Sequence, residues 1–257
     1  MAEVNELAGV PSPRRQLNLF YLIDTSYSME GQKIESINQV MPEVIDMVAD
    51  ISENNKDNAF ITVSCLSFNS TSQWMFDNPV DAKYFNWTPL TVTGDTQVGK
   101  MCAKLEAALH RGTKEKPGTM YSETGHKNPC IIILSDGAPT DDWKPEFEKL
   151  KKNAWFKAAT KLAIAIGNDA DLDMLAEFVG SKEKVVGVHS IQGLKDMIST
   201  ASCAVSKVGS QSAGVSTQSD NDQIQKEINN VAEENKTIIV NPSDKNDKME
   251  DNWDDFD

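Results

Sequence analysis

The chain has 257 residues, a formal net charge of −14 and a hydrophobic content of 39%. This length predicts one domain of about 200 residues with an additional segment, because a single core of that size is common. Lysine and arginine are dense only around residues 149–152, which reads as a solvated helix face. The acidic balance therefore argues against nucleic-acid binding, whose affinity comes largely from neutralised phosphates.

The N-terminal residues 1–16 carry four charged side chains and no apolar stretch of signal-peptide length. The apolar runs elsewhere are shorter than the about 20 residues that a membrane-spanning helix needs. We therefore expect an N-terminal extension over residues 1–16, no membrane span and a cytoplasmic protein.

The first half of the chain alternates apolar strands with a long amphipathic helix. Residues 17–23 and 58–68 are rich in aliphatic and aromatic side chains and predict buried strands. Between them, apolar residues recur every three or four positions over residues 34–51, which predicts a helix that Pro42 kinks or breaks. Residues 74–76 predict a short edge strand, and residues 98–110 a second helix with an apolar face.

The second half continues the same alternation. Strands are predicted at residues 129–134, 161–166 and 184–189, and helices from about Asp141, at residues 171–179 and at residues 193–205. Alternating strands and helices predict an α/β fold, with a doubly wound, mostly parallel sheet covered by helices on both faces.

The C-terminal part differs in composition from the rest. Residues 208–222 are rich in Ser, Gln and Gly and predict a flexible linker. From Asp220 onward the chain has twelve acidic and four basic residues, so we expect an acidic tail at residues 223–257 that is disordered alone. Within it, residues 224–231 form a nascent helix pattern, and residues 237–240 are a β-prone patch able to add to a sheet edge.

Three uses of the tail remain open. The tail is either a solubilising extension or a docking element, with Trp253 and Phe256 as the aromatic anchors that contact a partner. Its carboxylates can also reach a metal site, either in the same chain or in another chain, because the linker spans roughly 20 Å.

Oxygen-bearing side chains follow two of the predicted strands. Asp24, Ser26 and Ser28 follow the first strand at alternate positions, and Asp136 ends the strand at residues 129–134. Thr96 lies in the loop before the helix at residues 98–110, with Thr93 as the alternative in that loop. The carboxyl edge of a parallel sheet is where such folds bind ligands, and hard oxygen groups suit a hard cation such as Mg²⁺.

These five residues, in this order, resemble the metal-ion-dependent adhesion site (MIDAS) of von Willebrand factor A domains. The resemblance extends over residues 17–207 and is strongest to the bacterial tellurite-resistance-type (TerY-like) members. Those members share the Ser-Asp-Gly-x-Pro-Thr-Asp-x-Trp run found at residues 135–143 and the Ala-Ile-Ala-Ile-Gly phrase at residues 163–167. One departure is Gly94-Asp95, where family members often have two glycines before the threonine.

The resemblance implies a fold with one short antiparallel edge strand and a set of roles at the metal. Ser26 and Ser28 ligate Mg²⁺ directly, Thr96 joins when a ligand is engaged, and Asp24 and Asp136 act through water. Because hydroxyls are neutral, the ion keeps the capacity to accept an Asp or Glu of a partner protein. Tyr27 and Met29 flank the metal loop and are expected to form an apolar rim that contacts the partner. Mn²⁺ and Ca²⁺ remain possible alternatives to Mg²⁺.

Two classes of function follow. The first is a non-catalytic binding module, and the family implies a stress-response scaffold acting with a protein kinase and a PP2C-type phosphatase. The alternative is a Mg²⁺-dependent phosphatase of the haloacid-dehalogenase type, which also begins with a strand-terminal Asp. That chemistry needs a second acid two residues later, where this chain has Ser26.

Overall fold

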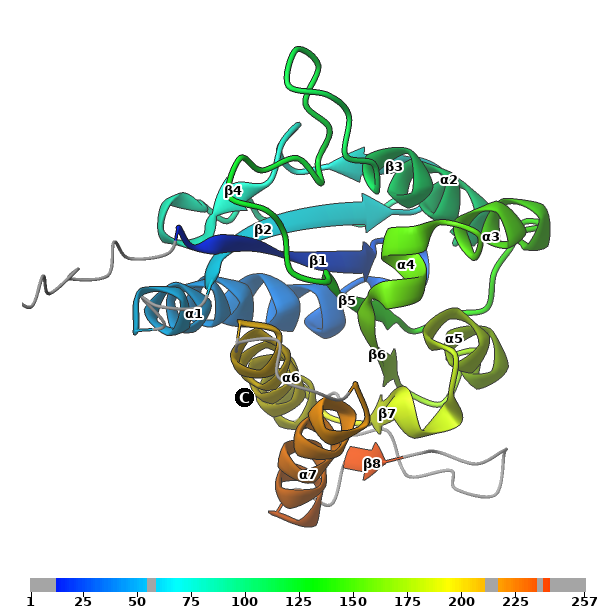
Figure 1. The fold of residues 1–257 in the computed structure, drawn as a ribbon. Helices are drawn as coiled ribbons and strands as arrows, with labels where there is room; N and C mark the ends of the chain where they lie inside the picture. The colour runs from blue at the N-terminus through cyan, green and yellow to red at the C-terminus, as the bar shows by residue number, and fades with distance from the viewer. Residues whose placement is uncertain (1–12, 55–58, 211–216, 235–237, 241–257) are drawn as a thin grey trace, which may run out of the picture.

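The computed structural model describes residues 13–54, 59–210, 217–234 and 238–240. An eight-stranded sheet forms the centre, with the order β3-β2-β1-β5-β6-β7-β8 and with β4 also paired to β2 (Figure 1). The strands are β1 (Arg15–Asp24), β2 (Ala59–Phe68), β3 (Ser72–Trp74), β4 (Val80–Asp81), β5 (Cys130–Ser135), β6 (Thr160–Ile166), β7 (Val185–Val188) and β8 (Ile238–Val240). The α-helices are α1 (Gln32–Asn54), α2 (Val98–Ala108), α3 (Lys144–Leu150), α4 (Ala154–Ala158), α5 (Leu172–Val179), α6 (Ile191–Ser210) and α7 (Thr217–Glu234).

The middle of the sheet is parallel, as the sequence predicts. β1 pairs with β2 and β5, β5 pairs with β6, and β6 pairs with β7, all in parallel. Every residue from position 17 to position 24 of β1 is buried, because helices cover both faces of the strand. β1 starts at Arg15, so residues 15 and 16 belong to the sheet and not to the predicted N-terminal extension.

Both edges of the sheet carry antiparallel strands. At one edge β3 and β4 pair with β2, which agrees with the predicted short edge strand near residue 74. At the other edge β8 pairs with β7, with Val188 opposite Ile238 and Val186 opposite Val240. β8 therefore runs from the carboxyl end of β7 toward its amino end.

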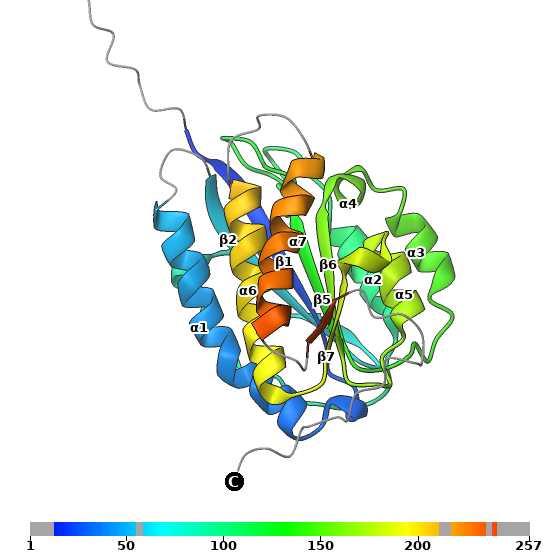
Figure 2. The same cartoon turned by 90° about the horizontal axis from the view of Figure 1, so that it is seen from below.

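Helices cover the two faces of the sheet in separate layers (Figure 2). One layer consists of α1, α6 and α7, and the other consists of α2 to α5; each layer packs on its own cluster of buried apolar side chains. α1 continues through Pro42, which lies on its exposed side, so of the predicted kink or break the break does not occur. Its apolar face holds the helix against the core on both sides of the proline. None of the helices in the described ranges combines the length and apolar composition needed to cross a membrane.

The C-terminal part differs from the predicted linker and disordered tail. α6 extends to Ser210, and α7 and β8 occupy much of the segment that composition alone predicts to be unstructured. Ile224, Ile228 and Ile238 are buried in the same core as α1 and α6. These few apolar side chains fold the segment because the sheet edge and α6 provide a surface that they cover.

Candidate metal centre

The candidate centre lies where β1 and β5 end side by side. Ile23 is opposite Leu134 in the parallel register, so the next residues, Asp24 and Ser135, are adjacent at the carboxyl edge of the sheet. The short helical turn at Tyr27–Met29 follows β1 and leads into α1. The topology thus brings together two loops that are more than one hundred residues apart in sequence.

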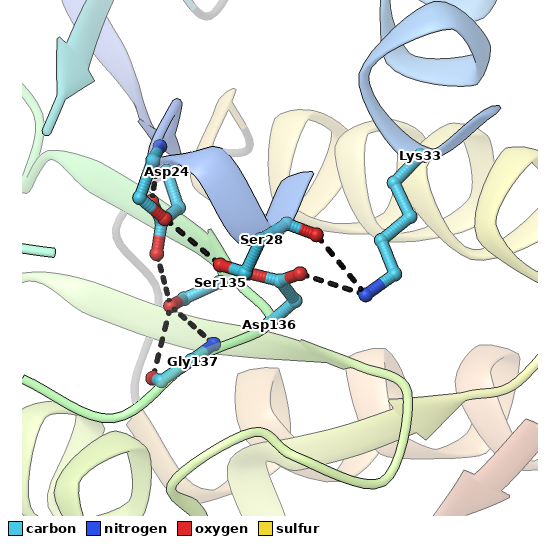
Figure 3. A network of polar contacts seen from close by, with 7 residues as sticks. Asp24, Ser28, Lys33, Ser135, Asp136 and Gly137 are labelled. Atoms are coloured by element: carbon cyan, nitrogen blue, oxygen red, sulfur yellow. Dashed lines mark hydrogen bonds and ion pairs between the residues drawn. The ribbon is translucent and has the colours of Figure 1, made fainter. Parts of the chain in front are cut away.

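Asp24 organises the first loop from a buried position. One carboxylate oxygen, Oδ1, accepts a hydrogen bond from the backbone N–H of Ser26 at 2.9 Å. The other, Oδ2, accepts a hydrogen bond from Ser135 Oγ at 2.6 Å (Figure 3). Asp24 is fully buried, so this carboxylate fixes both the backbone after β1 and the end of β5.

The hydroxyls of Ser26 and Ser28 connect the first loop to Asp136. Ser26 Oγ lies 3.0 Å from Ser28 Oγ, and Ser28 Oγ donates to Asp136 Oδ1 at 2.7 Å. Ser26 and Asp136 are buried, whereas Ser28 is exposed. Three of the predicted ligands therefore form one continuous oxygen cluster that opens to solvent at Ser28.

The loop at residues 93–96 closes the cluster from a third side. Backbone hydrogen bonds join it to the first loop, from Thr93 N to Thr25 O at 2.8 Å and from Tyr27 N to Gly94 O at 3.0 Å. Thr96 is buried, whereas Thr93 is exposed. A Cβ added at Gly137 would lie 3.4 Å from Thr96 Oγ1 and 3.5 Å from Ser28 Oγ, so both hydroxyls border the space that this glycine leaves open. This geometry favours Thr96 over Thr93 as the threonine of the site.

A cation of the protein itself already contacts the cluster. Lys33, in the first turn of α1, places Nζ 2.7 Å from Asp136 Oδ2 and 3.4 Å from the backbone oxygen of Ser28 (Figure 3). The side chain of Asp136 is fully buried in this ion pair. The site therefore attracts positive charge.

Burial also destabilises the negatively charged form of Asp24. Desolvation raises the pKa of Asp24 above its usual range, and the nearby charge of Asp136 acts in the same direction, while hydrogen bonds from Ser135 and Ser26 oppose the shift. A cation placed among these oxygens would stabilise the charged carboxylate.

The donor set fits a hard divalent cation, since it consists of hydroxyl and carboxylate oxygens, and two of the hydroxyls, of Ser28 and Thr96, border the space beside Gly137. Only two carboxylates contribute, and within the described ranges no three His, Cys, Asp or Glu side chains gather in a manner suited to a metal ion. The hydroxyls of Ser26, Ser28 and Thr96 would therefore have to supply most of the protein ligands.

The predicted partner-contacting residues have different outcomes. The side chain of Tyr27 is 62% exposed next to the cluster, so it is accessible, and its contact with a partner stays a prediction. The prediction for Met29 is wrong: the side chain is fully buried in the core with α1, because the helical turn directs it inward. Trp253 and Phe256 lie outside the described residues.

Two residues of the network were not predicted as site residues. Ser135 had a partial signal in the sequence, because it is a polar side chain at the end of a buried strand, but its place beside Asp24 depends on the register of β1 and β5. Lys33 had no such signal, since one lysine in the first turn of an amphipathic helix is ordinary in sequence.

Comparison with known proteins places the fold among von Willebrand factor A domains. No protein-family model matches the chain. The chain is 23% identical over 189 residues to the human collagen alpha-5(VI) chain, a match that covers 71% of this chain and 6% of the collagen. Among solved structures, a von Willebrand factor type A protein from Catenulispora acidiphila superposes with a TM-score of 0.54 at 15% identity, covering 75% of this chain and 43% of that one.

Two further solved structures share the fold. The ArnB paralog VWA2 from Sulfolobus acidocaldarius has a TM-score of 0.52 at 15% identity, over 73% of this chain and 45% of that one. Proximal thread matrix protein 1 from the mussel byssus, described with a zinc-occupied MIDAS motif, has a TM-score of 0.51 at 17% identity, over 77% and 47%. The chain thus spans less than half the length of these relatives. At these identities the likeness establishes the von Willebrand factor A fold.

Proposed function

We propose that this protein is a non-catalytic module that binds a protein partner through a divalent metal ion. The observation that carries this proposal is the oxygen cluster in which Ser26, Ser28 and Asp136 are linked by contacts of 3.0 and 2.7 Å at the carboxyl edge of the sheet. The metal ion, for which Mg²⁺ is the proposed species, would supply an electrophilic centre at this edge.

The residues of the cluster would have two roles, ligation of the metal ion and positioning of its ligands. Ser26 and Ser28 would ligate the ion, and Thr96 borders the same open space above Gly137. Asp24 would hold the Ser26 backbone and the Ser135 hydroxyl in place while adding negative charge, and Asp136 would hold the Ser28 hydroxyl. With hydroxyls as the main ligands, the ion retains positive charge for an Asp or Glu of the partner. The exposed ring of Tyr27 would contact the apolar part of that partner.

The biological setting is proposed from the motif resemblance alone. The runs at residues 135–143 and 163–167 support a tellurite-resistance-type scaffold in a bacterial stress response, with a protein kinase and a PP2C-type phosphatase as partners. A cytoplasmic location remains a prediction. Trp253 and Phe256 remain proposed anchors in the acidic tail.

Occlusion of the site by the tail, in the same chain or in another chain, remains a proposal, because residues 241–257 lie outside the described residues. The last described residue of β8, Val240, pairs with Val186, near the amino ends of the parallel strands. The oxygen cluster lies at the opposite, carboxyl edge.

The phosphatase alternative is disfavoured by the position of Asp24. A nucleophilic Asp needs a free oxygen directed at the substrate, whereas both oxygens of this buried carboxylate accept hydrogen bonds. Activity on an aryl phosphate that depends on Mg²⁺ and disappears in Asp24→Asn would revive this alternative.

The metal site is tested by titrating Mg²⁺ into the protein with calorimetry and thermal unfolding in parallel. Asp24→Asn keeps the size of the side chain and removes its charge, so we expect Mg²⁺ binding and the associated stabilisation to be lost while the protein stays folded. Asp95→Asn is the matched control, because Asp95 is an exposed acid in the neighbouring loop. Mg²⁺ binding that survives in Asp24→Asn would contradict the assignment.

Capture of a carboxylate is tested separately with a peptide array. Peptides with a central Asp or Glu are compared with their Asn and Gln counterparts, in Mg²⁺ and in EDTA. We expect binding only for the acidic peptides and only in Mg²⁺. Equal binding of the acidic and amide peptides would refute a carboxylate-dependent mechanism.

A further inference from the structure

The ion pair between Lys33 and Asp136 differs from an ordinary surface salt bridge. The side chain of Asp136 has no exposed surface, and that of Lys33 is 20% exposed. In the Lys83–Glu53 pair, which has the same 2.7 Å separation, the two side chains are 54% and 52% exposed. Surface pairs of the latter kind contribute little to stability, whereas removing one partner of a buried pair leaves an uncompensated charge.

Lys33 uses the same groups as the candidate metal centre. Its ammonium contacts Asp136 Oδ2, while Asp136 Oδ1 accepts from the hydroxyl of Ser28. It also contacts the backbone oxygen of Ser28, the residue whose hydroxyl belongs to the oxygen cluster. Figure 3 shows that the lysine reaches the cluster from α1, from the side opposite Asp24 and Ser135.

We infer that the Lys33 ammonium is a built-in competitor of the divalent cation and sets the affinity of the centre for metal. This inference rests on the proposed function. Two buried carboxylates, Asp24 and Asp136, require positive charge nearby, and Lys33 provides it to Asp136 directly. A divalent cation that enters the cluster meets a carboxylate that is already neutralised, and it also meets the repulsion of the ammonium. The protein therefore exchanges between a lysine-paired state and a metal-loaded state in which the hold of Lys33 on Asp136 is weakened.

The reciprocal consequence concerns stability without metal. In the lysine-paired state Lys33 stabilises the folded protein, because it compensates a fully buried carboxylate. The metal takes over that role when it binds. Removal of Lys33 should therefore lower the stability of the metal-free protein more than that of the metal-loaded protein.

The test compares Lys33→Met with the wild type by calorimetric titration of Mg²⁺ and by thermal unfolding in EDTA and in saturating Mg²⁺. We expect Lys33→Met to bind Mg²⁺ about tenfold more tightly or better, within the range of measured couplings between linked sites. We also expect a lower melting temperature in EDTA and a smaller difference from the wild type in Mg²⁺. Lys33→Arg, which keeps the charge, should bind Mg²⁺ like the wild type.

The control is Lys83→Met, which removes the same charge from the exposed pair with Glu53 and should leave Mg²⁺ affinity unchanged. If Lys33→Met does not fold, Lys33→Gln supplies the same comparison with a neutral hydrogen-bond donor. Unchanged or weaker Mg²⁺ binding without the lysine charge would overturn the role of Lys33 and leave the metal centre standing. No Mg²⁺ binding in the wild type or in any variant would overturn both.

Discussion

The C-terminal helix α7 provides a quantitative test of the fold, because composition predicts disorder where the structure shows packing. Ile228 has no exposed surface and belongs to the core shared by α1 and α6. Replacing a fully buried Ile by Ala typically costs about 2–5 kcal/mol through lost burial and the remaining cavity. For Ile228→Ala we expect a loss of about 3 kcal/mol, which lowers the melting temperature of a domain this size by roughly 6–12 °C.

Urea unfolding followed by circular dichroism, with calorimetric melting in parallel, measures this loss. The matched control is Glu227→Ala, because Glu227 is the exposed neighbour in the same helix and should change stability by less than about 0.5 kcal/mol. If Ile228→Ala unfolded at the same urea concentration as Glu227→Ala, α7 would not pack on the sheet in solution. The segment would then behave as the disordered tail that its composition predicts.

Two further predictions concern the site loop and the half-buried Lys161. Gly94 has φ 67°, and a Cβ there would lie 2.3 Å from Ser70 Oγ, whereas Gly125 has φ 88° and open space around it. Both Gly→Ala variants should lower the free energy of unfolding by about 1–2 kcal/mol, because alanine disfavours a left-handed backbone. Gly94→Ala should lower it by about 1–3 kcal/mol more because of the clash with Ser70. Urea unfolding measures both losses, and equal losses would contradict the close contact at Gly94. Burial, helped by the charge of Lys184, lowers the pKa of Lys161 to about 8, so the unfolded chain binds more protons than the folded protein from about pH 8 to about pH 10.4. The contribution of Lys161 to stability should therefore rise with pH across that window. The free energy of unfolding of the wild type, compared with that of Lys161→Met, should shift in favour of the wild type as the pH rises. A difference that does not depend on pH would refute this prediction.

Local sequence pattern was sufficient for most elements of the fold. The predicted strands at residues 17–23, 58–68 and 129–134 correspond to β1, β2 and β5, since buried parallel strands are continuous apolar runs. Of the kink or break predicted at Pro42, the break does not occur, because packing of the apolar face holds α1 together despite the proline. The helix pattern at residues 224–231 and the β-prone patch at residues 237–240 correspond to α7 and β8. The expectation that they are disordered alone did not account for the surface of α6 and β7 on which their isoleucines are buried.

For the site, the sequence indicated which residue types end the strands, and the register brought them together. Asp24 holds the Ser26 backbone, Ser28 links Ser26 to Asp136, and Thr96 lies near Ser28 beside Gly137, although their role as metal ligands remains a proposal. Met29 was misplaced because the alternation of residues in the loop does not reveal which side chain a helical turn directs inward.

The sequence by itself determined the alternation of strands and helices and the oxygen-rich residues at the strand ends, because both depend on local periodicity and composition. Only the tertiary structure decided that Ser135 supports Asp24, that Lys33 pairs with Asp136 and that the C-terminal segment completes the sheet. These contacts join residues about one hundred or about fifty positions apart. Their energies arise from burial and charge in the folded protein, which no local pattern in the chain records.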